Sequence, residues 1–209
     1  IGQDLDHANL YAARGVRVVQ LTYNPANSLG DGSMAPQNQG LTDQGRAVID
    51  RLNQLNLMVD LSHSGEQTCL AAINASRAPI SINHTGCRAL VDLPRNKTDA
   101  ELRLVAERGG FVGIYFMPFL HPTGQVAAAD IVAHIEHAVQ VCGEDHVGLG
   151  TDGSITQVDD LVAYRKAVAV EVEARRKARI GAPGESGDIL KFDASASTDP
   201  DRDTLRYSW

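Results

Sequence analysis

The sequence is poor in the residues that build disulfide frameworks, nucleic-acid surfaces and membrane spans. Its three cysteines are odd in number and widely spaced, which excludes a disulfide scaffold and a cysteine-based zinc site and indicates core thiols. The formal net charge is −7 and no dense cluster of Lys or Arg occurs, so nucleic acid is not expected as a partner. The longest apolar runs are far shorter than the ~20 residues of a membrane-spanning helix, so no transmembrane segment is expected. Small molecules and peptides are therefore the better candidates for a ligand.

Short apolar runs rich in β-branched residues alternate with helical patterns along most of the chain. The predicted strands are Val16–Leu21, Leu57–Leu61, Pro79–Ile82, Phe111–Phe116 and Val147–Gly150, and their continuous apolar character is typical of a parallel sheet buried on both faces. Helical spacing begins after Thr42 and Asp43, after Asp130, and over the segment from Asp99 to Arg108. This alternation predicts an α/β fold, either a doubly wound sheet or a (β/α)8 barrel.

The residues that follow the strands favour the barrel. No glycine-rich phosphate-binding motif follows a strand, as it would in a doubly wound nucleotide-binding fold. Polar residues follow instead, namely Tyr23 and Asn24, His63, His84 and Asp152. Barrel enzymes place their chemistry at the carboxyl ends of several strands. Eight strands are required and five are visible, so we predict a partial (β/α)8, TIM-like barrel.

His63 and His84 carry the strongest indication of chemistry. Each closes a short apolar run where a strand should give way to a loop, and a helix-like segment lies between them, so two imidazoles should emerge side by side at one rim. Neutral imidazole is a good zinc ligand. A single histidine at a strand end is usually only a half-exposed polar residue, so it is the repeated position that predicts a metal site.

The composition changes toward the C-terminal end. Glycine and proline between residues 181 and 187 break regular structure, and residues 188–209 read as two alternating strands around a turn. We therefore expect a partial barrel over residues 1–187 and a β-hairpin-like tail over residues 188–209. The chain begins at Ile1 without an initiator methionine or a signal-peptide pattern, so we expect it to be a piece of a longer protein.

Several separated motifs together resemble the membrane dipeptidase (renal dipeptidase) family of zinc metallopeptidases, in the form of its bacterial members. In chain order they are Leu21-Thr22-Tyr23-Asn24, Asp60-Leu61-Ser62-His63, Asn83-His84-Thr85, Pro94-Arg95-Asn96 and His146-Val147-Gly148-Leu149-Gly150-Thr151-Asp152. The similarity covers residues 1–187, and the tail resembles the opening strands of a PKD-type β-sandwich module.

The resemblance implies a (β/α)8 barrel with two zinc ions bridged by a glutamate, in which a metal-bound hydroxide hydrolyses dipeptides. His63 and His84 match the two ligands of one zinc ion. Arg95 would hold the carboxylate of the dipeptide and Asp152 would pair with its free amine. Tyr23 aligns with a histidine that polarises the scissile carbonyl, so it would either donate a hydrogen bond to an oxyanion or only pack against its neighbours.

The family's first-strand His-x-Asp pair and its bridging glutamate have no match in these 209 residues. We therefore expect an N-terminally truncated, inactive segment that holds at most one zinc ion weakly. Its unpaired sheet edges leave room for a homodimer. One alternative is a non-catalytic secreted binding protein with a remnant barrel and an immunoglobulin-like module, and another is an unrelated metal-dependent amidohydrolase. Family and tail together favour a periplasmic or secreted location.

Overall fold

The computed structural model describes residues 5–124 and 126–153, together with six helical positions farther along, Val162, Ala163, Lys166, Ala169, Val170 and Glu173. The chain divides into two units, Ile1–Thr156 and Gln157–Trp209. The six positions in the second unit are all exposed. The β-rich tail predicted over residues 188–209 lies outside the described residues, so the architecture below is that of the first unit.

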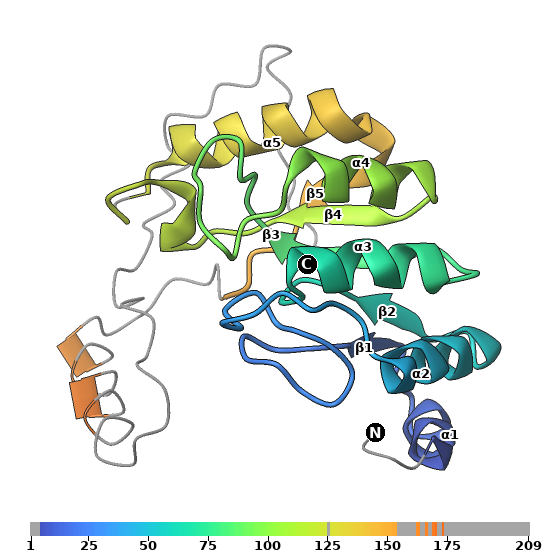
Figure 1. The fold of residues 1–209 in the computed structure, drawn as a ribbon. Helices are drawn as coiled ribbons and strands as arrows, with labels where there is room; N and C mark the ends of the chain where they lie inside the picture. The colour runs from blue at the N-terminus through green and yellow to red at the C-terminus, as the bar shows by residue number, and fades with distance from the viewer. Residues whose placement is uncertain are drawn as a thin grey trace, which may run out of the picture. The chain divides into compact units, whose positions relative to one another are not determined.

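Five parallel strands form one sheet whose spatial order equals the chain order. They are β1 (Val18–Gln20), β2 (Met58–Asp60), β3 (Ser81–Thr85), β4 (Phe111–Ile114) and β5 (Val147–Leu149). All five predicted strands are confirmed. A doubly wound sheet reverses its strand order at a switch point, whereas a barrel adds each strand beside the previous one. The order without reversal confirms the α/β prediction and agrees with a partial barrel (Figure 1).

A helix connects each strand to the next, with one further helix before β1. The helices are α1 (Asp6–Ala13), α2 (Asp43–Gln54), α3 (Glu66–Ala75), α4 (Asp99–Glu107) and α5 (Ala128–Cys142), with short 3₁₀ turns η1 (Pro118–Leu120) and η2 (Glu144–His146). From α2 to α5 each helix packs against its successor (Figure 1). Among the helices in the described ranges, none combines the length and hydropathy that a membrane span requires.

Side-chain caps explain where two of these helices begin. The Thr42 side chain accepts a hydrogen bond from the backbone of Gly45 at the start of α2, as the sequence predicted. For α5 the prediction placed Asp130 ahead of the helix, but α5 begins at Ala128. Asp130 lies in its first turn and accepts from the backbone N–H of Ala127 at 2.7 Å. A carboxylate in the first turn satisfies the same unpaired N–H groups from inside the helix.

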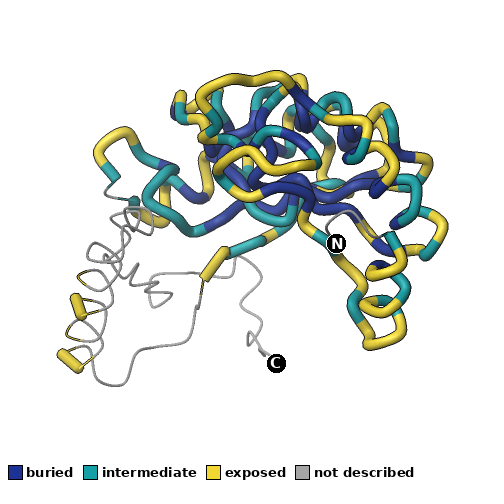
Figure 2. The backbone as a smooth tube through the Cα atoms, turned by 60° about the horizontal axis from the view of Figure 1, so that its bottom comes forward, coloured by how far each residue is buried: buried dark blue, intermediate teal, exposed yellow. Residues whose placement is uncertain are grey.

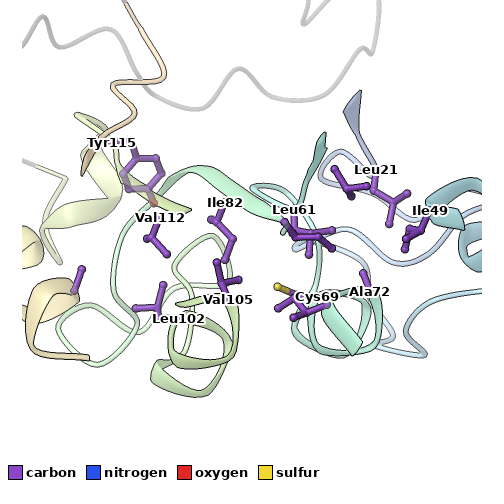
Figure 3. Packing of buried hydrophobic residues seen from close by; sticks show 14 of the residues in the cluster. Leu21, Ile49, Leu61, Cys69, Ala72, Ile82, Leu102, Val105, Val112 and Tyr115 are labelled. Carbon is purple, nitrogen blue, oxygen red and sulfur yellow. The ribbon is translucent and has the colours of Figure 1, made fainter. Parts of the chain in front are cut away.

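The core lies between the sheet and the helices (Figure 3). Apart from Tyr115, the residues labelled there fall into three groups. Leu21 faces Ile49, Leu61 lies near Cys69 and Ala72, and Ile82 and Val112 lie near Val105 and Leu102. Apolar residues at helical spacing supply one half of this layer, and alternate strand residues supply the other. The cysteines behave as predicted, since Cys69 and Cys87 are buried and Cys142 is partly buried.

The opposite face of the sheet is open at the amino ends of its strands. Val18, Met58 and Phe111 are 44%, 40% and 36% exposed, although the residues that follow Met58 and Phe111 are buried. The prediction of strands buried on both faces is therefore wrong for these positions. Helices cover one face only, and apolar residues that alternate with the core set remain in solvent (Figure 2). The polar residues of the motifs lie at the carboxyl ends of the strands.

Candidate metal centre

His63 and His84 lie next to each other at the carboxyl ends of β2 and β3. Their ring centroids are 4.9 Å apart and the rings meet edge to face at 73°. The predicted strand ended at Ile82, but β3 continues to Thr85 with a register shift between these two residues. His84 therefore sits within an irregular stretch of strand. Bulges of this kind re-aim side chains at barrel rims, which is how a residue inside β3 reaches the same place as one beyond β2.

The irregular part of β3 explains two glycines in the neighbouring strands. The carbonyl oxygen of Asn83 projects across β4 toward the start of the loop after β5. A Cβ atom would lie 2.1 Å from this oxygen at Gly113 and 1.7 Å from it at Gly150. Both contacts are far shorter than atoms allow, so only glycine fits at either position. Gly150 precedes Asp152 by two residues, so this close packing also sets where the Asp152 loop leaves the sheet.

Asp152 completes a group of three side chains that could hold a metal ion. One ligand atom from each of His63, His84 and Asp152 lies within 4.8 Å of the other two. Oδ2 of Asp152 is 3.8 Å from Nε2 of His84. The backbone at Asp152 has a φ of 55°, a left-handed conformation that Asp and Asn adopt more readily than most residues. Across residues 5–124 and 126–153, this is the one such group that the fold assembles.

Hydrogen bonds determine which ring nitrogen of His63 carries a proton. Its Nδ1 lies 2.8 Å from the side-chain oxygen of Asn24, which can only accept, so Nδ1 is the protonated nitrogen. Its Nε2 therefore presents a lone pair, and Nη2 of Arg95 donates to it at 3.3 Å. A histidine held through one nitrogen by a hydrogen-bond acceptor is the usual arrangement of a metal ligand. Sequence reasoning noted Asn24 only as a polar residue after a strand and missed this role.

Arg95 and Tyr23 flank His63 on different sides. Arg95 is 5% exposed, and its Nη1 donates to the carbonyl oxygen of Ser62 at 2.7 Å. Tyr23 is 60% exposed, and its ring stacks on the imidazole of His63 with centroids 4.2 Å apart and planes at 22°. The structure thus brings together all five residues predicted for the site, with Tyr23 at its open side.

Burial keeps both histidines neutral at ordinary pH. Burial, with a smaller contribution from the positive charge of Arg95, lowers the pKa of His63 to about 3. Burial also lowers the pKa of His84, although the nearby carboxylate of Asp152 opposes this effect. Neutral imidazole is the form that binds a metal. The site therefore holds its nitrogens in a ligating form without competition from protons near pH 7.

Comparison with known proteins decides the family. The model of the membrane dipeptidase family (Peptidase family M19) matches residues 1–173. The chain belongs to this family. A Klebsiella pneumoniae protein described only as an uncharacterized protein in the pqqA 5' region is 34% identical over 172 residues, which cover 77% of this chain and 63% of that protein. Dipeptidase tcpJ of Claviceps purpurea is 30% identical over 182 residues, which cover 83% of this chain and 43% of that protein.

A solved structure shows the same arrangement of the chain. The metallo peptidase from Rhodobacter sphaeroides, crystallised with a phosphinate mimic of the dipeptide L-Ala-D-Ala, is 28% identical with a TM-score of 0.69. The match covers 88% of this chain and 55% of that structure. This chain thus spans about half the length of that structure. It spans 63% of the Klebsiella pneumoniae protein and 43% of dipeptidase tcpJ.

The metal ions that the family name implies fit the residues present. Nε2 of His84 is buried and has no hydrogen-bond partner among the described residues, which is costly unless another group completes its coordination. Nε2 of His63 carries a second lone pair nearby, which a metal would take in place of the hydrogen bond from Arg95, and the carboxylate of Asp152 adds an oxygen. Two imidazoles and a carboxylate are a ligand set that Zn²⁺ accepts, with positions left for water or substrate.

Ser62 joins the two histidine-bearing segments of this family member. Its hydroxyl donates to Oδ1 of Asp60 at 2.5 Å and accepts from the backbone N–H of His84 at 3.0 Å. The same Oδ1 accepts from the backbone N–H of Asn83 at 3.1 Å. From the sequence, Asp60 at a strand end before His63 has two possible roles, supporting a metal ligand or capping a helix. It caps no helix and instead ties the end of β2 to β3, so the two imidazoles keep their relative position.

His134 and His137 lie three residues apart on an amphipathic helical pattern, from which the sequence predicts surface or partly buried side chains. For His134 this prediction is wrong, because its side chain is 1% exposed. Its Nδ1 accepts from the backbone N–H of Cys87 at 2.9 Å, and its Nε2 contacts the carbonyl oxygen of Leu120 at 3.1 Å. His137 is partly buried and lies 2.7 Å from Asp99. A histidine can replace an apolar residue on the inner face of a helix when both ring nitrogens find partners.

Proposed function

We propose that this chain carries the two-histidine half of a zinc-dependent dipeptidase site. The observation that supports the proposal most directly is the convergence of His63, His84 and Asp152 at one rim, with Arg95 bonded beside them. Family membership supports the reaction class, and the Rhodobacter sphaeroides relative, solved with a dipeptide mimic, supports the substrate class. Because the chain spans only part of its relatives, the activity is proposed for the assembled enzyme.

His63 and His84 would hold one zinc ion through their Nε2 atoms. Asn24 keeps the proton of His63 on Nδ1, so Nε2 keeps a lone pair that zinc would take in place of the hydrogen bond from Arg95. When bound, zinc supplies a Lewis acid that polarises the peptide carbonyl and lowers the pKa of an attacking water. The stacked ring of Tyr23 covers His63 on its solvent side and so limits how many directions remain open to water.

Arg95 would bind the carboxylate of the dipeptide. A guanidinium group has five N–H donors, and the two described bonds to Ser62 and His63 leave others available. The bond to the Ser62 carbonyl holds the guanidinium plane in place, so little rotational entropy remains to be lost when a carboxylate binds. The arginine thereby orients the scissile bond toward the histidine pair.

Asp152 would bind the free amine of the dipeptide, as the family resemblance implies. Its carboxylate stands close enough to His84 to contribute to the metal site as well. An amine bound here and a carboxylate bound at Arg95 would together fix both ends of the substrate. Longer peptides lack one of these charges at the matching distance, so the pair of contacts selects dipeptides.

The 209-residue chain alone is proposed to bind one zinc ion weakly and to hydrolyse no dipeptide. The described residues bring together three candidate ligands, which is fewer than a binuclear site needs. The first experiment is calorimetric titration of the chain with zinc, with His63→Ala and His84→Ala as test variants and Val132→Ala, an exposed position on α5, as the control. We expect weak binding that both histidine variants abolish.

A chimera tests the activity itself. Residues 1–173 would replace the matching segment of the Rhodobacter sphaeroides metallo peptidase, and hydrolysis of L-Ala-D-Ala would be measured with added zinc. We expect turnover by the chimera, none after His84→Ala, and a raised KM after Arg95→Lys, because lysine lacks the planar fork. A folded chimera that binds zinc but cleaves no dipeptide would contradict the proposed reaction. Turnover by the isolated chain would contradict the proposed division of the site.

A further inference from the structure

The backbone around His63 is held on both sides by cations from one loop. Arg95 donates to the carbonyl oxygen of Ser62, the residue before the histidine, at 2.7 Å. Nζ of Lys97 donates to the carbonyl oxygen of Ser64, the residue after it. Charge-assisted hydrogen bonds to two carbonyls that flank one residue restrict the rotation of both its peptide groups. His63 is therefore fixed through its main chain as well as through its ring.

Lys97 is a fully buried cation with one acidic partner. Its side chain is 2% exposed, and Nζ lies 3.2 Å from Oε1 of Glu101, whose side chain is 1% exposed. The other carboxylate oxygen, Oε2, accepts from the backbone and hydroxyl of Thr98 at the start of α4. Burial acts to raise the pKa of Glu101, but the charge of Lys97 and the bonds from Thr98 outweigh it and lower the pKa, so the carboxylate stays ionised.

Stability alone does not explain this buried pair. Taking two charges out of water costs about as much as their attraction returns, and apolar side chains of similar size often stabilise a core better. The main chain of Lys97 is also anchored at both ends, since its N–H donates to Gly86 at 3.0 Å and its carbonyl accepts from Arg88 at 2.8 Å. The side chain of Lys97 therefore links the loop after β3 to the segment that carries His63, and it is bonded at both ends.

We propose that Lys97 is a positioning residue for the metal site. By fixing the Ser64 carbonyl it holds the backbone of His63 so that Nε2 points to the same place as Nε2 of His84. This inference rests on the proposed function, because it assumes that the two histidines hold a metal. It goes beyond that function because it assigns a role to Lys97, a residue that binds neither metal nor substrate and contacts the backbone of the His63 segment.

The test compares two variants that differ in one hydrogen-bond donor. Lys97→Met/Glu101→Gln removes both charges and leaves no donor for Ser64, whereas Lys97→Gln/Glu101→Gln keeps a neutral donor on a side chain one bond shorter. Zinc affinity of the 209-residue chain would be measured by competition with a chromophoric chelator. We expect the methionine variant to bind zinc about tenfold more weakly than wild type and the glutamine variant to fall between them, since loss of support behind a ligand typically costs ~10–100-fold.

A stability control separates positioning from general loosening. Ile49→Val shortens a fully buried residue of α2 away from the site, so it should lower the resistance to urea and leave zinc affinity unchanged. Lys97→Arg keeps a charge for Glu101 and a donor for Ser64, so it should bind zinc within about threefold of wild type, which keeps the test valid if the double variants do not fold. Equal zinc affinities in wild type and both double variants would overturn the positioning role and leave the proposed function intact. A His63→Ala variant that still bound zinc as wild type does would overturn the proposed function itself.

Discussion

The two sides of the candidate site are built differently. At the ends of β2 and β3, His63 is 5% exposed, and hydrogen bonds hold its ring and the carbonyls beside it. At the end of β5, the side chain of Asp152 is 32% exposed, and the nearest described side-chain bond is local, from Thr151 to the carbonyl of Gly153 at 2.9 Å. The first side is fixed by side chains from distant segments, whereas the second is held through its backbone, where the N–H of Phe116 donates to the carbonyl of Thr151 at 3.0 Å.

The cause of this difference lies in the sheet. Strands β2 and β3 have hydrogen-bonded neighbours on both sides, whereas β5 pairs only with β4 among the described strands. A strand between two neighbours leaves its terminal loop surrounded by other loops, and hydrogen bonds between those loops follow. The histidine side is therefore held in place by neighbouring loops before any ligand binds. The position of the Asp152 side is set by the backbone at the edge of the sheet.

The largest expected effect is on zinc affinity, when the candidate ligands on the two sides are replaced one at a time. His63→Ala or His84→Ala should weaken zinc binding by on the order of 100-fold or more, beyond the ~10–100-fold typical of supporting residues, because each removes a preorganised nitrogen. Asp152→Ala should cost less than about tenfold, since an exposed, locally held carboxylate is less organised. Calorimetric titration with zinc checks this order. An Asp152 variant as damaged as the histidine variants would show that the two sides act equally.

The loss of unfolding free energy should also be larger for a change on the histidine side than for one on the Asp152 side. Ser62→Ala removes the hydroxyl that joins Asp60 to the backbone of His84 and leaves a buried N–H group unpaired, so it should cost about 1–3 kcal/mol of unfolding free energy. Thr151→Ala removes an exposed bond and should cost less than about 0.5 kcal/mol. Urea denaturation of the metal-free proteins measures both. Similar losses in the two variants would erase the distinction between the sides.

Acid should destabilise the fold through His134, a buried histidine of α5 outside both sides of the site. Burial lowers the pKa of His134 below its ordinary value of 6.5, so as pH falls below about 6.5 the unfolded chain takes up a proton that the folded chain refuses. The stabilising effect is fully present above that pH and is lost progressively below it. His134→Gln should therefore reduce the slope of unfolding free energy against pH by up to ~1.4 kcal/mol per pH unit. Val132→Ala on the same helix is the control, and an unchanged slope in the His134 variant would refute the prediction.

The smallest effect is expected for the backbone at Asp152. Asp152→Asn keeps a residue that tolerates the left-handed conformation and should change the unfolding free energy by less than about 0.5 kcal/mol. Asp152→Val places a β-branched residue at the same φ of 55° and should cost ~1–2 kcal/mol. Thermal unfolding of both variants gives the comparison. If valine were tolerated as well as asparagine, the local turn would not be what holds this side of the site.

Much of the fold could be predicted because its signals are local. Each of the five strands is a short apolar run, and α2 and α4 begin at residues that a threonine can cap. The rim position of His63 and His84 followed from the strand ends, since parallel strands bring their carboxyl ends to one edge. The prediction failed where a strand departs from regular geometry, as β3 does beyond Ile82, because a register shift depends on the neighbouring strands.

The supporting residues of the site could not be predicted from local patterns. Asn24 contacts His63 from 39 positions away, and Cys87 reaches His134 across 47 positions. Lysine is usually a surface residue, and only the fold shows that the side chain of Lys97 is 2% exposed. Nothing within a few residues of these positions indicates such partners, so a reading along the chain treats them as ordinary polar residues.

By itself the sequence determined the alternation of strands and helices, the parallel sheet, and the position of His63, His84 and Asp152 at one rim, because strand and helix periodicities are properties of neighbouring residues. Only the tertiary structure decided which nitrogen of His63 faces the site, which cations hold its backbone, and that glycine alone fits beside the Asn83 carbonyl. These outcomes depend on atoms from separate segments that meet within a few ångströms, and burial makes each unpaired group among them costly.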